Sequence, residues 1–357
     1  MKVKAVKVTC RVAGTDYLII GAGPAGISAG LKLSEEGFKV EVHEAARKPA
    51  MKPCGWGIPL PETLPFQVPE ESVKKHIDGA SLYVDGEHVL DYTGKNLGVV
   101  VDKPLMLGLL ADQHSVDVLY KSPVNLRRMR FGPDKGRVII AGGFPWYKGE
   151  TINAIQLHLK TSYSWGELFE FYFDSGIIGY YWIFPLGKHV VKVGVGGFKD
   201  VSTLKSLLDR FIKRDERLRE SQPISKLEGA KLAVGGIRVE ESYPLVIGEA
   251  AGSVYPLTGE GIRPSMIMGY SAAKALSNGE DPIKAIQRTD VYWKVNLQRK
   301  ILEKVKQLAP KSRADFLKNL NPEVLIRVGL GDFTKTSLLR LILKSPKILA
   351  AILKSFV

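Results

Sequence analysis

A short apolar segment, DYLII at residues 16–20, leads directly into GAGPAG at residues 21–26. A helical pattern follows, and FKVEVHE then predicts a second strand that ends at Glu44. A strand, a G-x-G-x-x-G loop, a helix, a second strand and an acidic residue in this order are typical of an α/β dinucleotide-binding domain. This arrangement constrains the fold more than any other part of the chain.

The positions of this motif have separate roles in holding a nucleotide. Gly21 permits the tight turn, Gly23 lets the backbone approach a pyrophosphate, and Gly26 lets the helix pack closely on the strand. The amino terminus of the helix faces the phosphates. Glu44 can accept hydrogen bonds from a free ribose, which favours FAD or NAD over NADP. The nucleotide-binding residues predicted in this segment are Gly21, Gly23, Pro24, Ala25, Gly26, Glu44 and Ala45.

The same segment contains a pattern that is typical of esterases. Residues 26–30, GISAG, match G-x-S-x-G, in which the serine must sit on a sharp turn directly after a strand. Ser28 falls inside the predicted helix, after the glycine loop. We therefore expect Ser28 to be a small packing residue, and we do not predict a hydrolase.

A second glycine-rich segment begins near residue 248. The strand-like SYPLVIGEAAG (242–252) precedes SVYPLTGEGIRPSM (253–266), which predicts a loop and then a helix. The amino terminus of that helix can place the positive end of its dipole against a flavin ring or its ribityl-phosphate chain. Alone this is ordinary loop chemistry, but with the first motif it predicts a two-part FAD site. The residues assigned to the second part are Gly248, Glu249, Pro256, Gly259, Gly261 and Ile262.

The composition narrows the class of protein. With 357 residues, 45% of them hydrophobic, the chain can bury one large core or two modest ones. The chain has no run of about 18 apolar residues that would predict a membrane-spanning helix, and its amino terminus has no apolar signal region. Two cysteines, Cys10 and Cys54, indicate a reducing cytoplasm and no disulfide framework. The six histidines have no metal-ligand spacing, so we expect no metal site.

The formal net charge of +14 indicates an anionic partner, which can be nucleic acid, a membrane surface or an acidic protein. No nucleic-acid-binding motif is found, so we expect no nucleic acid. Near the carboxyl end, KSPKILAAILKSFV (344–357) mixes lysines with leucine and isoleucine. It predicts either an ordinary amphipathic helix packed on the protein or a peripheral contact with the inner face of a membrane.

Residues 177–197, IIGYYWIFPLGKHVVKVGVGG, place aromatic side chains on alternate positions of a predicted strand. Alternate residues of a strand point to the same side, so these aromatic rings share one face. A core strand would account for them, because aromatic residues favour strands; the wall of an apolar binding site is the alternative. The residues assigned to this wall are Tyr180, Trp182, Phe184, Pro185, Gly194 and Gly196, with a predicted extension by Tyr163, Trp165, Phe169, Phe171, Tyr172 and Phe173.

Four motifs in order resemble the geranylgeranyl reductase family, within the flavoproteins related to p-hydroxybenzoate hydroxylase. They are GAGPAG with Glu44; KPCGWGI (52–58), which is similar to the family's K-x-C-G-x-G element; Y-x-W-x-F-P with its following glycines; and GEAAG with PLTGEGI. The first and last motifs occur in many flavoproteins, whereas the cysteine element and the aromatic strand are specific. The resemblance spans residues 16–280 of the chain.

This resemblance implies a Rossmann-type FAD-binding domain and the hydrogenation of isolated double bonds in geranylgeranyl chains. The chain can belong to a prenyl lipid, a prenyl diphosphate or a quinone tail. A prenyl chain offers only apolar surface for binding, so the aromatic wall becomes one side of a tunnel beside the flavin. Cys54 is expected beside the reacting bond and Gly55 against the flavin; a buried structural cysteine is the alternative.

Three positions depart from the family pattern. Glu249 stands where the second FAD motif usually has aspartate, and it is expected to reach the ribityl chain with one more methylene. Lys103 stands where an arginine near the phosphates is usual, and lysine lacks the bidentate fork. Gly142, in VIIAGGFPW, interrupts a segment that commonly reads A-D-G or A-T-G.

The chain shows no second dinucleotide motif, so the resemblance implies an external electron donor. This donor is either NAD(P)H that binds transiently or a small acidic electron carrier, which a basic surface would attract. Two other functions stay open. A flavin monooxygenase of the hydroxylase type would share the FAD motifs without needing the cysteine element, and a non-catalytic flavoprotein would fit the changes at Glu249 and Gly142.

The predicted architecture has a discontinuous FAD domain, an antiparallel β domain for the substrate and a carboxyl-terminal helical region. An Asp-Gly turn in SLYVDGEHVLDY (81–92) predicts a hairpin in the substrate domain. The last region is expected to cap the site or to touch the membrane that holds the substrate. The predicted ranges are 1–50, 98–148 and 235–285 for FAD, 51–97 and 149–234 for the substrate, and 286–357 for the helices.

Overall fold

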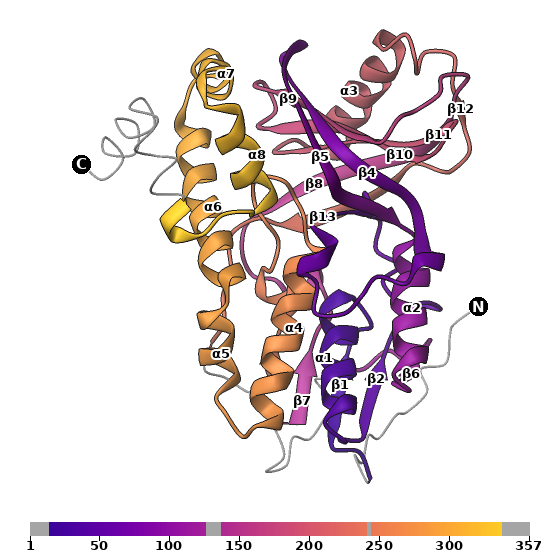
Figure 1. The fold of residues 1–357 in the computed structure, drawn as a ribbon, viewed down its shortest axis with the longest axis vertical. Helices are drawn as coiled ribbons and strands as arrows, with labels where there is room; N and C mark the ends of the chain where they lie inside the picture. Colours follow the sequence, from indigo (N-terminus) through magenta and orange to yellow (C-terminus); the bar gives the residue numbers. More distant parts are fainter. Residues whose placement is uncertain (1–13, 126–136, 241–243, 338–357) are drawn as a thin grey trace.

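The computed structural model describes residues 14–125, 137–240 and 244–337. Figure 1 shows a lower layer of parallel strands and helices, an upper twisted sheet, and a column of carboxyl-terminal helices along one side. The lower layer and the upper sheet have separate hydrophobic cores. The cavity described below lies between the upper sheet and loops of the lower layer.

The lower sheet has five parallel strands in the order β14-β7-β1-β2-β6. Its central strand β1 is buried throughout, because Ile19 packs in the core shared with the helices and Leu18 and Ile20 pack with Val124 and Val246 on the other face. This explains the uninterrupted apolar run of the sequence at this point. The strands are β1 (Tyr17–Ile20), β2 (Val40–His43), β6 (Asp117–Leu119), β7 (Val138–Ile140) and β14 (Leu245–Val246).

Three helices accompany this sheet: α1 (Pro24–Glu35), α2 (Lys103–Gln113) and α4 (Ile262–Ser277). Helices α1 and α4 pack closely because the residues at their contact are small. A Cβ atom at Gly269 of α4 would lie 2.3 Å from the carbonyl oxygen of Ala25 in α1. The two glycine motifs of the sequence, which precede α1 and α4, are therefore brought side by side.

The upper sheet has the strand order β12-β8-β11-β10-β9-β4-β5-β3, and β13 also pairs with β8. All pairs are antiparallel except β4 with β9, so the sheet is mixed and mostly antiparallel, as predicted. The strands are β3 (Gly57–Pro59), β4 (Val73–Val84), β5 (Glu87–Val101), β8 (Thr151–Lys160), β9 (Leu168–Asp174), β10 (Gly179–Gly187), β11 (Val190–Gly197), β12 (Gln222–Pro223) and β13 (Glu228–Ala233).

The hairpin predicted from the Asp-Gly turn is confirmed. Strands β4 and β5 pair from Val84 and Glu87 onward, and the turn residues Asp85 and Gly86 have φ angles of 49° and 84°. Two successive positive φ angles define the turn that matches the twist of a hairpin, and Asp-Gly suits them. Strand β5 continues to Val101, through the boundary predicted at 97/98. The domain limits themselves stay a prediction.

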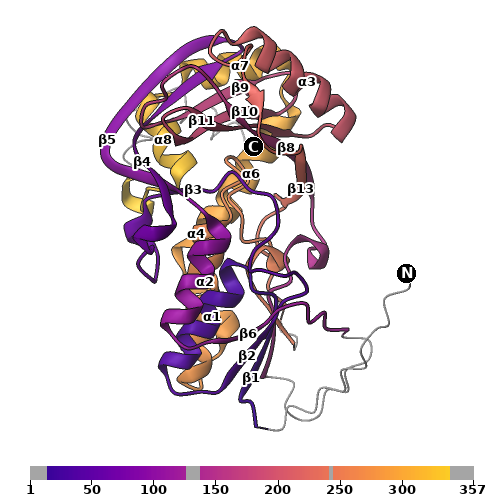
Figure 2. The same cartoon turned by 90° about the vertical axis from the view of Figure 1, so that its right-hand side faces the viewer.

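Helix α3 (Val201–Arg214) lies over the outer face of the upper sheet (Figure 2). Asp200 caps it by accepting a hydrogen bond of 2.9 Å from the backbone nitrogen of Thr203. Its apolar stripe, with Leu204 and Leu208 buried, packs on side chains of the sheet that include Ile183. Because side chains alternate along a strand, the opposite face of β10 is left for the cavity.

The remaining helices follow α4 in the sequence and form the column at the side of Figure 1: α5 (Pro282–Arg288), α6 (Asp290–Gln307), α7 (Pro310–Asn319) and α8 (Pro322–Leu330). Helix α8 contacts β5, and Nζ of Lys294 in α6 donates to the carbonyl of Gly331 after α8, at 2.9 Å. None of the helices in the described part of the chain combines the length and apolar character needed to cross a bilayer. The basic segment 344–357 lies outside the described residues.

Candidate active site

The first glycine loop has the shape that a pyrophosphate requires. Gly21 has a φ angle of 108°, and a Cβ atom there would lie 2.5 Å from the carbonyl oxygen of Ala141. A Cβ atom at Gly26 would lie 1.9 Å from the carbonyl oxygen of Gly21, so neither position tolerates a side chain. At Gly23, by contrast, no atom lies within 4 Å of the Cβ position. This open space at the start of α1, where Pro24 is the first residue, fits a phosphate group.

Glu44 ties this loop to the end of β2. Its Oε2 accepts a hydrogen bond of 2.9 Å from the nitrogen of Ala22, and its Oε1 accepts one of 2.8 Å from the nitrogen of Ala46. Each carboxylate oxygen has a further acceptor site, so these bonds are compatible with the predicted ribose contact. Ala45 is exposed beside it. The sequence did not indicate that Glu44 also shapes the loop.

The second glycine motif lies against the first. Gly248 has a φ angle of 68°, and a Cβ atom there would lie 2.5 Å from Cβ of Ala25 in α1. Gly261 is the N-cap of α4, as predicted, and Ile262 begins the helix and is buried. Pro256 is buried but does not line the cavity, whereas Gly259, Gly261 and Ile262 do.

Glu249 has a protein partner that the sequence did not indicate. Its Oε1 and Oε2 lie 2.5 and 2.6 Å from Nζ of Lys52, and Oε1 also accepts a hydrogen bond of 3.2 Å from Ala233. The carboxylate predicted to reach a ribityl chain is thus ion-paired with the first residue of the cysteine element. The longer glutamate side chain makes this pair without excluding a second acceptor contact.

Lys103 contacts the backbone of the cysteine element. It is buried at the start of α2, and its Nζ donates a hydrogen bond of 2.9 Å to the carbonyl of Lys52. Burial lowers the pKa of Lys103. The phosphate contact assigned to Lys103 stays a prediction.

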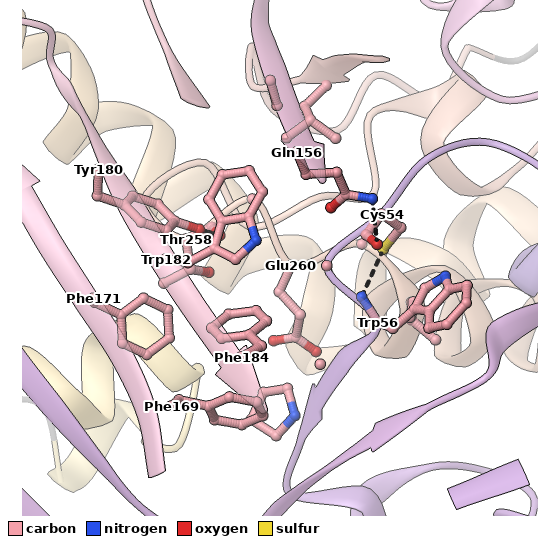
Figure 3. A pocket seen from close by; sticks show the side chains of 18 of the residues that line it. Cys54, Trp56, Gln156, Phe169, Phe171, Tyr180, Trp182, Phe184, Thr258 and Glu260 are labelled. Carbon is pink, nitrogen blue, oxygen red and sulfur yellow. Dashed lines mark hydrogen bonds between the residues drawn. The ribbon is translucent and has the colours of Figure 1, made fainter. Parts of the chain in front are cut away.

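The cysteine element and the aromatic strand both line a cavity of about 120 Å³ (Figure 3). Tyr180, Trp182 and Phe184 all line it, so the predicted shared face is confirmed. Cys54 lies across from them in Figure 3, and the loop that precedes α4 contributes Thr258. The other aromatic lining residues are Trp56, Phe169 and Phe171.

The glycines of β11 make room for these rings. A Cβ atom at Gly194 would lie 2.2 Å from Cζ2 of Trp182, and one at Gly196 would lie 3.7 Å from its Cζ3. Likewise, a Cβ atom at Gly55 would lie 3.0 Å from Cε2 of Phe184, so the cysteine loop rests on that ring. Pro185 does not line the cavity, because it occupies the next position of the strand and belongs to the opposite face.

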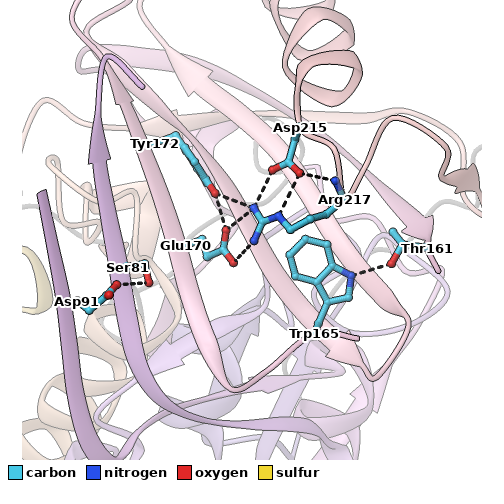
Figure 4. A network of polar contacts seen from close by, with 8 residues as sticks. All are labelled: Ser81, Asp91, Thr161, Trp165, Glu170, Tyr172, Asp215 and Arg217. Carbon is cyan, nitrogen blue, oxygen red and sulfur yellow. Dashed lines mark hydrogen bonds and ion pairs between the residues drawn. The ribbon is translucent and has the colours of Figure 1, made fainter. Parts of the chain in front are cut away.

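The predicted extension of the wall is only partly right. Phe169 and Phe171 line the cavity, and Phe173 contacts the ring of Tyr180 without lining it. Trp165 and Tyr172 belong to the opposite face, near α3, where Arg217 binds Glu170, Tyr172 and Asp215 (Figure 4). Tyr163 is exposed. For Tyr172 the error has a simple cause: alternation along β9 sends Tyr172 to the face opposite Phe171, whereas Tyr163 and Trp165 precede this strand.

The polar groups of the cavity are few. Tyr180 donates its hydroxyl to the carbonyl of Thr258, and burial raises the pKa of Tyr180. Glu260 is neutralised by two hydrogen bonds of 2.8 Å from Arg263. Nε1 of Trp182 and Oγ1 of Thr258 are buried and have no hydrogen-bond partner among the described residues. The cavity is therefore apolar, with two neutral hydrogen-bonding groups that a ligand can use.

Two residues that the sequence analysis did not assign hold Cys54. Nζ of Lys192 and Nε2 of Gln156 lie 2.9 and 3.0 Å from the carbonyl oxygen of Cys54. A signal for Lys192 was present: it stands two positions before Gly194, on the face of β11 that meets the aromatic rings.

Ser28, which the sequence analysis did not accept as a nucleophile, is fully buried, and its hydroxyl donates to the carbonyl of Met266 at 2.7 Å.

Residues 152–231 match the family model of the geranylgeranyl reductase catalytic domain. Curated relatives include a digeranylgeranylglycerophospholipid reductase of Methanocaldococcus jannaschii, 27% identical, with 94% of this chain and 96% of the relative covered. The enzyme of the same name from Picrophilus torridus is 26% identical, with 80% and 85% covered. These matches confirm the family resemblance drawn from the four motifs.

Solved structures confirm the fold. A geranylgeranyl bacteriochlorophyll reductase-like protein of Thermoplasma acidophilum superposes with a TM-score of 0.76 at 21% identity, covering 96% of this chain and 99% of that one. A triple mutant of a flavin-dependent brominase gives a TM-score of 0.69 at 15% identity, covering 95% and 99%. The predicted α/β architecture, with a parallel Rossmann-type sheet and a second β sheet, is thus confirmed.

Proposed function

We propose that this chain, a flavin-dependent oxidoreductase with a geranylgeranyl reductase catalytic domain, saturates isolated double bonds of geranylgeranyl chains in a digeranylgeranylglycerophospholipid. The observation that carries the proposal is the position of Cys54. It lines the same apolar cavity as Tyr180, Trp182 and Phe184, although the cysteine element and the aromatic strand are far apart in the sequence. A sulfhydryl group beside an apolar wall suits an alkene that must receive a proton.

We propose FAD as the flavin. The open space at Gly23, the start of α1 and the carboxylate of Glu44 fit a pyrophosphate and a ribose, and the Gly259–Ile262 loop fits the ring end of the cofactor. When bound and reduced, the flavin supplies the hydride. The role of the surrounding residues is to bind the chain, exclude water and provide the proton.

The residues that line the cavity suit these roles of binding the chain, excluding water and providing the proton. Apolar burial is worth about 25 cal/mol per Å², and the aromatic rings supply the surface against which a prenyl chain can be buried. The salt bridge between Glu260 and Arg263 leaves no unpaired charge there among the described lining residues. We assign Cys54 to the position beside the second carbon of the double bond, where a weak acid packs as an apolar group until it donates its proton.

The test is an anaerobic incubation of the reduced protein with three substrates: a digeranylgeranylglycerophospholipid, geranylgeranyl diphosphate and a prenyl quinone. The expected result is a mass increase of two hydrogen atoms for each saturated double bond, greatest with the phospholipid. Cys54→Ala should lower the rate about 10²-fold or more, as expected for loss of a general acid. Product that forms only with oxygen would establish the monooxygenase instead, and the absence of any product with bound flavin would favour a non-catalytic flavoprotein.

The electron donor is a separate proposal. The formal net charge of +14 favours a small acidic electron carrier over NAD(P)H, because opposite charges accelerate the encounter of two proteins. Stopped-flow reduction of the bound flavin by each donor tests it. Reduction by the carrier should slow steeply as salt is added, whereas faster reduction by NADH or NADPH at every salt concentration would contradict the proposal.

A further inference from the structure

The carbonyl oxygen of Cys54 is held by two side chains from neighbouring strands. Nζ of Lys192 in β11 lies 2.9 Å from it, and Nε2 of Gln156 in β8 lies 3.0 Å from it. Figure 3 shows Gln156 reaching toward Cys54 from the strand behind the cavity. Across the β8–β11 pair, Gln156 stands opposite Gly194, which has no side chain to block the approach.

Both side chains are withdrawn from solvent. Lys192 has an exposed fraction of 0% and Gln156 of 3%. Lys192 also places Nζ 3.3 Å from the ring centroid of Trp56, so that one amine contacts residues on both sides of Gly55. Burying an amine is costly unless it is hydrogen-bonded, and Lys192 makes such a bond to the Cys54 carbonyl.

The opposite side of the same loop is also fixed. Gly55 rests on the ring of Phe184, where a Cβ atom would approach to 3.0 Å. The nitrogen of Trp56 lies 3.5 Å from Sγ of Cys54, within reach of a weak hydrogen bond. The position of the thiol thus depends on the backbone of the loop, and Lys192 and Gln156 fix that backbone through the Cys54 carbonyl.

We propose that Lys192, assisted by Gln156, is a positioning residue that fixes the Cys54 thiol at the wall of the cavity by holding the Cys54 carbonyl. Its consequence for turnover rests on the proposed function, whereas its effect on the loop does not. Loss of either donor leaves the carbonyl with one partner and lets the loop open away from the aromatic wall. The thiol then becomes more accessible and less well placed.

The first experiment measures the loop without substrate. The rate of Cys54 alkylation by iodoacetamide is followed in the flavin-loaded protein, in a Cys10→Ser background so that a single thiol reacts. Lys192→Met and Gln156→Leu should each react about tenfold faster, as expected for the loss of one buried hydrogen bond. The matched control is Lys231→Met, which removes an exposed lysine from the neighbouring strand β13.

Alkylation of both variants at the rate of Lys231→Met would overturn the proposal. Flavin absorbance and thermal unfolding report whether each variant folds. Should Lys192→Met fail to fold, Gln156→Leu still tests whether the hold on the Cys54 carbonyl places the thiol, because it removes one of the two donors and leaves Lys192 in place.

The second experiment asks whether Lys192 acts through the thiol. In turnover of the prenyl substrate, Lys192→Met should lower kcat about tenfold with little change in KM, because the aromatic wall is intact. In a Cys54→Ala background the same substitution should have no further effect, since no thiol remains to be positioned. An equal loss in both backgrounds would show a general structural role and overturn the positioning role. Faster alkylation without any turnover would instead overturn only the proposed function.

Discussion

Nζ of Lys52 lies 2.5 Å from Oε1 of Glu249, and this ion pair joins the cysteine element to the second glycine motif across 197 positions of the chain. The side chains have exposed fractions of 26% and 14%, so water screens the pair only in part. Together with the hydrogen bond from Lys103 to the carbonyl of Lys52, it sets where the loop bearing Cys54 meets the lower layer.

Removal of this ion pair should lower the free energy of unfolding. Glu249→Gln is expected to lower the free energy of unfolding by about 1–3 kcal/mol, because Lys52 is left half-buried without its counter-charge. The control is Glu36→Gln, which breaks an exposed pair with Lys32 on α1 and should cost less than about 0.5 kcal/mol. Denaturant unfolding gives both values, and equal losses would contradict the importance of the Lys52 contact.

Gly194 should be intolerant of any side chain. Gly194→Ala places a methyl group 2.2 Å from Cζ2 of Trp182 and 2.6 Å from the carbonyl of Ile155, so either the indole or the strand must move. We expect a loss of about 1–3 kcal/mol in unfolding free energy and a higher KM for the prenyl chain. Gly108→Ala, in α2 with no atom within 4 Å of the new methyl, should leave the protein as stable or slightly more so. Equal unfolding free energies of Gly194→Ala and Gly108→Ala would contradict the prediction.

The network on the outer face of the upper sheet should also stabilise the fold (Figure 4). Arg217 donates two hydrogen bonds of 2.8 Å to Glu170 and two, of 3.0 and 2.7 Å, to Asp215. Arg217→Met is expected to cost about 2–3 kcal/mol, since two carboxylates lose their common partner. Arg219→Met removes an exposed arginine two positions away and should change stability by less than about 0.5 kcal/mol. Thermal unfolding compares them directly.

The buried amine of Lys192 predicts a pH dependence of stability. Burial lowers its pKa from 10.5 to about 7, and Glu228, Asp102, Lys103, His158 and Cys54 are the titratable groups around it. Between these two pKa values the unfolded chain binds the proton and the folded chain does not. The stability contribution of Lys192 therefore rises with pH across this window, by at most about 1.4 kcal/mol per pH unit.

This dependence is measured as the difference in unfolding free energy between the unmodified protein and Lys192→Met at several pH values. The difference should increase in favour of lysine from about pH 7 towards pH 10.5. A difference that is constant over this range would mean that Lys192 keeps its ordinary pKa.

Much of the fold follows from local patterns. The strand, glycine loop and helix at residues 16–35, the Asp-Gly hairpin and the start of α4 after Gly261 were predictable, because each depends on backbone conformations that only a few residues favour. The shared face of Tyr180, Trp182 and Phe184 followed from the two-residue period of a strand. That period also shows why Tyr172 was wrongly assigned to the same wall.

The sequence by itself determined the class of the protein: a glycine loop with its acidic residue, a cysteine element and an aromatic strand, each encoded within a few consecutive residues. Only the tertiary structure decided which of these residues meet. It brought Lys192 and Gln156 to the carbonyl of Cys54, and Lys52 to Glu249. Such contacts join residues that are distant in the chain, and their geometry depends on how two sheets and their loops pack, which no local period specifies.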